Sequence, residues 1–241
     1  MRRPADARPS RLRRGAAFGA TCARLTRRAR ATVHYGVMGT ARERYLQALD
    51  LFSAEARAGA DRLGLPSACA EWSIADVIRH VTGVQAEYGG SALLGRAEGD
   101  GALTADHSAV MGPGTDFEAV ELWEGLSARL RSAAHEADED AFRALPLATL
   151  DMALHAWDIR WGSARVGLAG NLEFPADLLE WMEDYRERAN EQSIRKPTVF
   201  GAPVDPPADA TRSERFAAWT GRETRTGVRP RADSLPGPSE R

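Results

Sequence analysis

The chain has 241 residues, of which 43% are hydrophobic and 27% charged, a composition that excludes a wholly disordered protein. Its longest apolar runs fall far short of the roughly 20 residues that a membrane-spanning helix needs, so we expect no membrane partner. Residues 1–37 hold ten Arg and one Asp, a net charge of +9, whereas the rest holds 22 basic and 33 acidic residues. An acidic folded region argues against nucleic acid as its main partner.

The first 37 residues are Arg-rich and lack helical periodicity. Their apolar stretch is too short to serve as a signal-peptide core. We interpret residues 1–37 as a disordered or spurious basic extension, with a nucleic-acid-binding arm as the alternative. The two cysteines, Cys22 and Cys69, are too few for a disulfide framework and fit a reducing cytoplasm, which is the predicted location.

Apolar residues recur at three- and four-residue spacing from about residue 41 to 63, which predicts a first helix that Gly64 and Pro66 end. A second helix opens at the capping box Ser73–Asp76 and is expected to end near Gly89–Gly90. Residues 95–115, rich in Gly and small polar residues, are predicted to form a loop.

A third helix is predicted over residues 116–137 and a fourth over 147–165. The fourth is apolar on nearly every face, so we expect it to be buried at the centre of the fold. A fifth helix, 175–192, and a short helix near 214–220 follow.

No segment has the period of a strand, and no internal repeat is found, so the predicted fold class is all-α. We expect a helical bundle over residues 38–195, a Pro-rich return segment over 196–222 and a disordered tail over 223–241.

The chemically informative residues are polar side chains on helix faces that should be apolar. Asp151 and His155 are four residues apart and lie one turn apart on the same face of the predicted fourth helix. A carboxylate in such a helix must be paired, hydrogen-bonded or bound to metal, because burying it alone costs several kcal/mol. His80 lies at the edge of the buried stripe of the second helix.

Two interpretations of these residues stay open from spacing alone. Two imidazoles and a carboxylate from two helices can hold a divalent ion, and three protein ligands leave a fourth position open, as in catalytic sites. Alternatively, Asp151 and His155 pair with each other, and His80 is a boundary histidine with a hydrogen-bond partner.

Three segments carry a resemblance to a known family. The segment from Pro66 to His80 (PSACAEWSIADVIRH) resembles the opening motif of actinobacterial DinB-like proteins related to mycothiol-dependent maleylpyruvate isomerase. The segment from Asp151 to Asp158 (DMALHAWD) is similar to that family's acid-x-x-x-His-x-Trp-Asp segment. The ending from Phe200 (FGAPVDPPADA) through Thr220-Gly221-Arg222 resembles an uncharacterised branch of the family.

The resemblance implies a DinB-like four-helix bundle with a divalent metal, usually zinc, held by His80, Asp151 and His155. Asp151 stands where the isomerase has Glu, and the chain has room only for a short return in place of the isomerase's second domain. We therefore expect a substrate other than maleylpyruvate.

The residues around this triad have weaker assignments. Asp158 and Trp157 are predicted to contact the metal ligands without binding the metal themselves. Alternatively, Trp157 packs in the core, and Asp158 bonds to a backbone group or to an Arg. Arg222 is a candidate contact for an anionic ligand. Trp72 is expected in the core rather than in substrate stacking, and Cys69 is expected to be a buried, inert thiol.

The resemblance further implies that the metal activates the thiol of mycothiol for attack on a small electrophile. Net transfer would make the protein an S-transferase, and addition followed by elimination would make it an isomerase. The alternatives are a metal- or thiol-binding module without turnover and a metal-assisted hydrolase. We expect a monomer or a homodimer.

Overall fold

The computed structural model describes residues 39–69, 72–95, 115–116, 118–190, 194–195 and 200–224. Over these ranges the secondary structure is helical apart from an isolated bridge between Pro66 and Ser73, so the predicted all-α class is confirmed for them. None of the described helices is long and apolar enough to cross a membrane. The predicted extension over 1–37, nearly all of the predicted loop and most of the predicted tail lie outside the described residues.

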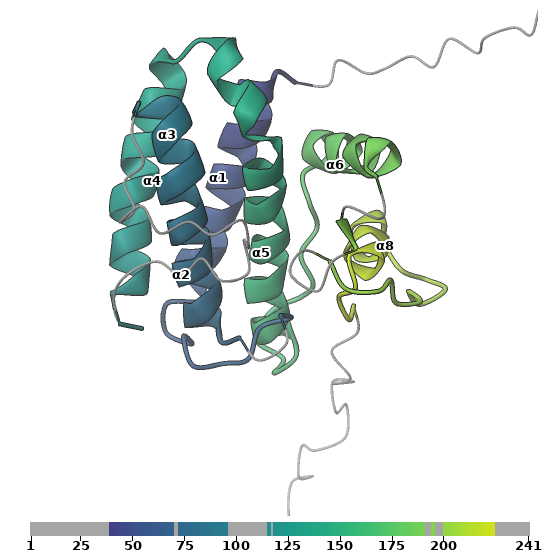
Figure 1. Ribbon diagram of the computed structural model, residues 1–241. Helices are drawn as coiled ribbons and strands as arrows, with labels where there is room; N and C mark the ends of the chain where they lie inside the picture. Colours follow the sequence, from purple (N-terminus) through teal and green to yellow (C-terminus); the bar gives the residue numbers. More distant parts are fainter. Residues whose placement is uncertain are drawn as a thin grey trace, which may run out of the picture. The chain divides into compact units, whose positions relative to one another are not determined.

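Four helices lie side by side around the core (Figure 1): α1 (Ala41–Ala58), α2 (Ile74–Val84), α4 (Ala119–Glu136) and α5 (Pro146–Ala164). The helices α1 and α2 each contact both α4 and α5. As its composition predicts, α5 is buried on nearly every face. Removing this apolar surface from water is the main force that holds the helices together.

The first helix begins as predicted but ends earlier. A capping box between Thr40 and Glu43 starts it, and it ends at Ala58 rather than at residue 63. Gly59 caps this end, and an added Cβ there would lie 3.1 Å from Ile74 Cγ2 and 3.2 Å from Ile159 Cγ2. The end of α1 therefore packs closely on α2 and α5 at a residue without a side chain.

The predicted end of the second helix at Gly89–Gly90 is wrong. The chain continues from α2 through a π-helical turn, η1 (Gln85–Gly89), into α3 (Gly90–Leu93). Buried Gln85 accepts a hydrogen bond from Tyr45 Oη at 2.9 Å and donates one to the Ala148 carbonyl at 2.9 Å. A Cβ at Gly89 would lie 2.9 Å from Tyr45 Oη, so this glycine permits close packing instead of ending the helix.

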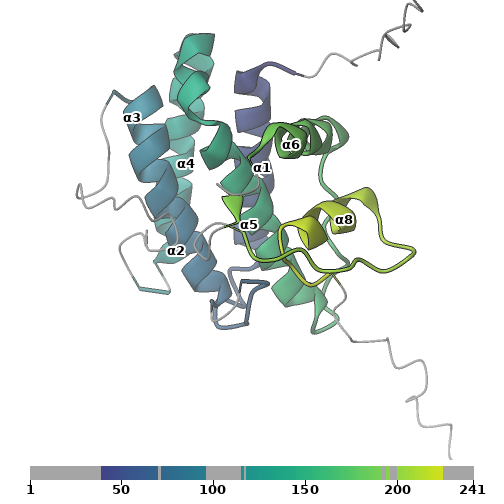
Figure 2. The ribbon, with the colours of Figure 1, turned by 45° about the vertical axis from the view of Figure 1, so that its right-hand side comes forward.

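The remaining helices lie near their predicted positions, with one addition. A 3-10 helix, η3 (Glu139–Ala144), precedes α5 and was not predicted. The helix α6 (Ala176–Arg188) contacts α1, and α8 (Arg212–Trp219) lies near α5 (Figure 2). Phe174 and Phe216, whose ring centroids are 6.4 Å apart, join the same hydrophobic core as the four helices.

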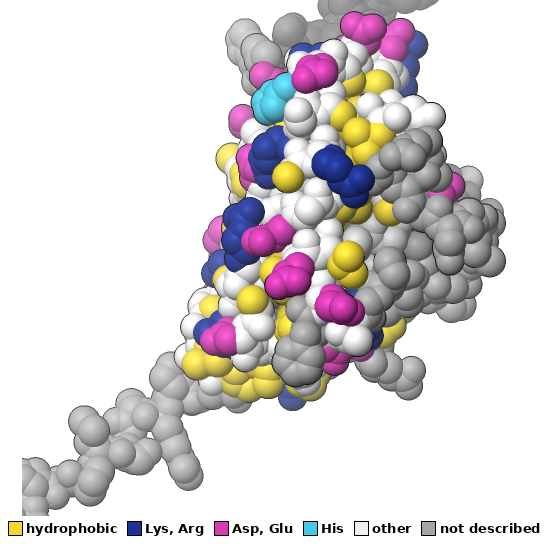
Figure 3. Space-filling view, turned by 90° about the vertical axis from the view of Figure 1, so that its left-hand side faces the viewer, with side chains coloured by type: hydrophobic (Ala, Val, Ile, Leu, Met, Phe, Trp, Pro, Cys, Tyr) yellow, Lys and Arg dark blue, Asp and Glu magenta, His cyan; other side chains and the backbone are white. Residues whose placement is uncertain are grey.

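The outward side of α4 is polar. Its inward positions, among them Trp123 and Leu130, are buried, whereas most of its other positions are exposed or half-buried. On this face of the molecule, acidic and basic side chains alternate, with small groups of hydrophobic side chains between them (Figure 3). The charged side chains of the candidate site lie instead between α2, α5 and the C-terminal segment.

Candidate metal centre

Three polar residues share one face of α5. Asp151, His155 and Asp158 follow at spacings of four and three residues, which places their side chains one above another along the helix. His155 and Asp158 are buried, at 7% and 0% exposure. Their neighbours on α5 are mostly apolar, so these three groups need partners among themselves, from other elements or from a ligand.

The structure brings His80, Asp151 and His155 together. Asp151 Oδ1 lies 3.5 Å from His80 Nε2 on α2 and 3.3 Å from His155 Nε2. Each residue offers a ligand atom, and these atoms lie within 4.8 Å of one another. Ligands about 2.0–2.2 Å from a tetrahedral ion are separated by about 3.3–3.6 Å, so both measured separations fit such an ion.

The second carboxylate oxygen of Asp151 has no partner among the residues that the structure describes. This atom, Oδ2, is buried. Burial disfavours the charged carboxylate, but the imidazoles of His155 and His80 outweigh it and hold the pKa of Asp151 far below its usual range. The carboxylate is thus ionised and has lone pairs available for a cation.

Asp158 fixes the orientation of the His155 ring. His155 Nδ1 lies 2.8 Å from Asp158 Oδ2. Because the neighbouring Arg222 holds the pKa of Asp158 far below normal against the effect of burial, this carboxylate can only accept, and Nδ1 must donate. The Nε2 lone pair of a neutral His155 then faces Asp151 and His80, as a metal ligand requires.

In the absence of a cation, His155 holds its proton strongly. Burial alone would lower its pKa, but the charge of Asp151 and hydrogen bonds with Asp151, Asp158 and Cys69 raise it well above the ordinary value. The imidazolium then lies between two carboxylates.

Arg222 and Cys69 also donate hydrogen bonds to the Asp158 carboxylate. Arg222 Nε and Nη2 donate to the two carboxylate oxygens at 2.6 and 2.7 Å, and the Cys69 thiol donates to Oδ2 at 3.1 Å. Burial and the Asp158 charge raise the pKa of Cys69, so the thiol stays protonated and serves as a donor.

A second set of potential ligands, Cys69, His155 and Asp158, shares His155 with the first. Its carboxylate is already bound at both oxygens by the Arg222 guanidinium, whose charge repels a cation. In the first set, by contrast, Asp151 Oδ2 has no hydrogen-bond partner among the described residues. The geometry therefore favours His80, Asp151 and His155 as the ligand set.

The remaining predicted site residues have different surroundings. Trp157 is 1% exposed and packs on Phe174, with ring centroids 5.9 Å apart, which fits its core-packing interpretation. Arg222, the candidate contact for an anionic ligand, is instead committed to Asp158 and to Thr220 Oγ1 at 3.0 Å. Trp72 is half-buried, and its ring stacks on His155 at 6.0 Å and tilts against His80 at 4.8 Å.

The contacts of Cys69 were not foreseen. The loop that carries it is docked on α5, because Ala68 N–H donates to the Asp158 carbonyl at 3.3 Å. A Cβ at Gly162 would lie 2.6 Å from the Pro66 carbonyl oxygen, so the loop approaches the helix more closely than any side chain would allow. Cys69 in the first loop and Gly162 in a helix-favouring pattern carry no local signal of this contact.

Comparison with known proteins identifies relatives of the chain, but none with a described activity. The chain is 30% identical over 183 residues to the uncharacterized proteins MT0763 and Rv0738 of Mycobacterium tuberculosis, strains CDC 1551 / Oshkosh and ATCC 25618 / H37Rv. The alignment covers 74% of this chain and 96% of each relative. No family model matches, and no solved structure matches. The chain belongs to the family of these uncharacterized mycobacterial proteins.

Proposed function

We propose that this protein binds a divalent metal ion, zinc by preference, through His80, Asp151 and His155, and that it is a thiol-dependent enzyme. The observation that carries the proposal is the position of Asp151 Oδ1, 3.5 and 3.3 Å from the two Nε2 atoms, together with a buried Oδ2 that has no partner among the described residues. His₂Asp sets suit zinc as well as other first-row divalent ions.

The protein's own residues account for the binding and orientation of such an ion. Asp158 keeps the His155 proton on Nδ1, and Arg222 keeps Asp158 ionised and fixed. Trp72 covers the two imidazoles and keeps water from one side of them. When bound, the ion supplies a positive charge that favours the thiolate form of a thiol in the open coordination position.

We further propose that α1, α2, α4 and α5 form a DinB-like four-helix bundle and that mycothiol is the thiol. The support is the side-by-side packing of these helices, the placement of His80 opposite Asp151, and the sequence segments that resemble this family. The product would be an S-conjugate in a transferase or a rearranged electrophile in an isomerase.

A metal-assisted hydrolase has less support from the geometry. Beyond the three ligands, Asp158 is the nearest candidate for a general base. Both of its oxygens accept hydrogen bonds from Arg222, and its depressed pKa makes it a weak base. A binding module without turnover is the alternative that the activity assay below distinguishes.

Metal analysis tests the ligand assignment. We expect about one zinc per purified full-length chain, and nearly none in the double variant His80→Ala, His155→Ala. His135→Ala is the matched control, because His135 is exposed on α4 and should retain zinc. Equal, substoichiometric zinc in wild type and double variant would refute the site.

Two further measurements test the thiol. Mycothiol added to the cobalt-substituted protein should change its visible spectrum, and an unchanged spectrum would exclude sulfur as a ligand. A chlorinated aromatic electrophile should be consumed faster with protein and mycothiol than with mycothiol alone. Equal rates would favour the binding module.

A further inference from the structure

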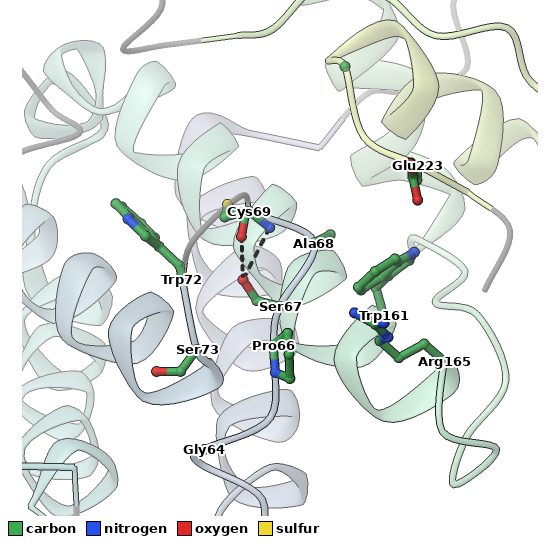
Figure 4. Close-up of a pocket in the computed structure, with 11 residues that line it drawn as sticks. Gly64, Pro66, Ser67, Ala68, Cys69, Trp72, Ser73, Trp161, Arg165 and Glu223 are labelled. Atoms are coloured by element: carbon green, nitrogen blue, oxygen red, sulfur yellow. Dashed lines mark hydrogen bonds between the residues drawn. The ribbon is translucent and has the colours of Figure 1, made fainter. Parts of the chain in front are cut away.

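A pocket of about 570 Å³ lies beside the candidate metal centre and has no part in holding the metal. Cys69 and Trp72 line one part of it, and Trp161, Arg165 and Glu223 line another (Figure 4). Cys69 and Trp72 also contact His155. A molecule in this pocket would therefore reach the side chains that pack on the metal ligands.

Trp161 has an unmet hydrogen-bond donor at this pocket. Its side chain is only 8% exposed, and its indole Nε1 is buried without an acceptor anywhere in the described ranges. Figure 4 shows the indole nitrogen on the side of the ring that faces Glu223. This nitrogen has almost no solvent-accessible surface, so a molecule in the pocket would lie against the indole ring rather than bond to its N–H.

Arg165 adds a positive charge next to this donor. It follows the last residue of α5 and is exposed, and its guanidinium lies over the Trp161 ring at 5.0 Å from the centroid. Within residues that the structure describes, no carboxylate pairs with it. Its exposed guanidinium is a donor suited to a carboxylate.

Glu223 limits the charge of what can enter. Its side chain is exposed on the opposite side of the Trp161 ring from Arg165 (Figure 4). A second negative charge on a ligand would meet this carboxylate, whereas a neutral planar body would lie against the indoles of Trp161 and Trp72. The pocket thus combines one anion site with apolar walls.

We infer that this pocket binds a small organic monocarboxylate with a planar apolar body, whose carboxylate pairs with Arg165 and whose body lies against the Trp161 indole. If the proposed function holds, this molecule is the electrophile, held with its reactive end toward Cys69 and Trp72. The assignment of the electrophile role rests on the proposed function, whereas the binding does not.

Cinnamate is a suitable probe, and its amide, cinnamamide, has the same planar body without the charge. We would titrate each into full-length, ¹⁵N-labelled, zinc-loaded protein and follow the indole N–H signals, with Trp161→Phe to assign the Trp161 signal. Cinnamate should shift the Trp161 signal, whereas that of Trp157, which packs on Phe174, should not move. Cinnamamide should bind about tenfold more weakly.

Charge-matched variants test the role of Arg165. Arg165→Gln should weaken cinnamate binding about tenfold, whereas Arg143→Gln, which removes an exposed Arg from η3, should leave it unchanged. Glu223→Gln should tighten binding severalfold, because it removes a like charge. An unmoved Trp161 signal at millimolar cinnamate, or equal weakening by both Arg variants, would overturn the inference.

The experiments can refute the proposed metal site and the proposed pocket ligand independently of each other. Cinnamate binding that depends on Arg165 in a protein without a zinc site would refute the proposed function and support the pocket assignment. Stoichiometric zinc at the triad together with an unmoved Trp161 signal would do the reverse.

Discussion

Two buried ion pairs on α5 have similar geometry and different surroundings. Arg160 donates to both oxygens of Glu55 on α1, at 2.6 and 2.5 Å, two residues after Asp158, which Arg222 binds in the same bidentate way. Glu55 has no other hydrogen-bond partner among the described residues, so this pair only links α1 to α5. Asp158 also accepts from His155 and Cys69. Such an ion pair can orient a candidate metal ligand only when its carboxylate also bonds to that ligand, as Asp158 does to His155.

The largest effect should come from removing the guanidinium of each pair. Arg222→Gln removes the guanidinium from the fully buried Asp158, leaving it only His155 and Cys69, and should lower the free energy of unfolding by about 3–5 kcal/mol. Arg160→Gln should cost less, because the Arg160 side chain is 30% exposed and water can replace it. Chemical denaturation of the zinc-free proteins measures both. A smaller loss for Arg222→Gln would show that its pair is the less important one for folding.

Replacing the two carboxylates should separate folding from metal binding. Asp158→Asn removes the charged acceptor of His155 Nδ1–H and should weaken zinc binding about 10–100-fold. Glu55→Gln, the matched change in the other pair, should leave zinc affinity unchanged, since Glu55 contacts none of the triad. Competition with a chromophoric chelator measures both constants. Equal zinc affinities would mean that Asp158 does not orient the ligand.

The pH dependence of zinc binding should reflect the His155 proton. Its pKa is raised well above the usual value in the metal-free protein, so below that pKa an ion must displace one proton to bind. Apparent zinc affinity should therefore rise with pH, by about tenfold per pH unit between pH 6 and 7. A pH-independent affinity would contradict His155 as a ligand.

The sign is reversed for stability without metal. A raised folded-state pKa stabilises the fold fully below the unfolded value, about 6.5 for His, and this contribution disappears as pH rises through the folded-state pKa. The metal-free protein should thus lose stability in the alkaline range, and zinc should restore it. Thermal denaturation from pH 6 to 9, with and without zinc, measures this difference.

The smallest effect should come from Cys69. Cys69→Ser keeps a donor to Asp158 and should change the free energy of unfolding by less than about 1 kcal/mol, with zinc affinity unchanged. Cys69→Ala removes the donor and should cost about 1 kcal/mol. A loss of zinc in both variants would instead make the sulfur a ligand, in favour of the set that Arg222 disfavours.

The sequence predicted local features well and long-range contacts poorly. Periodicity located the helices, and the i, i+4 spacing placed Asp151 and His155 on one face. The π-helical turn was missed because two glycines usually weaken a helix, whereas Gly89 makes room for Tyr45. The meeting of Arg222 with Asp158, 64 residues away, depends on how α8 packs beside α5, and no local pattern contains that information.

The pocket and the triad also depend on long-range contacts that the sequence does not show. Trp161 was predicted only as one apolar residue of a buried helix, and its unmet N–H is visible only once its neighbours are placed. His80 reached the triad through a family resemblance rather than through its spacing, because a histidine at a helix edge has many ordinary uses.

Gly162 has no reactive group, yet its position does not accommodate even the side chain of alanine. A methyl group there would displace the Pro66 carbonyl, and with it the loop whose Cys69 contacts Asp158. A relative that has lost the candidate site could therefore keep every proposed ligand and every charge and differ only by an alanine at this position. In judging which family members retain the site, the residue to inspect beside the histidines is one that has no side chain.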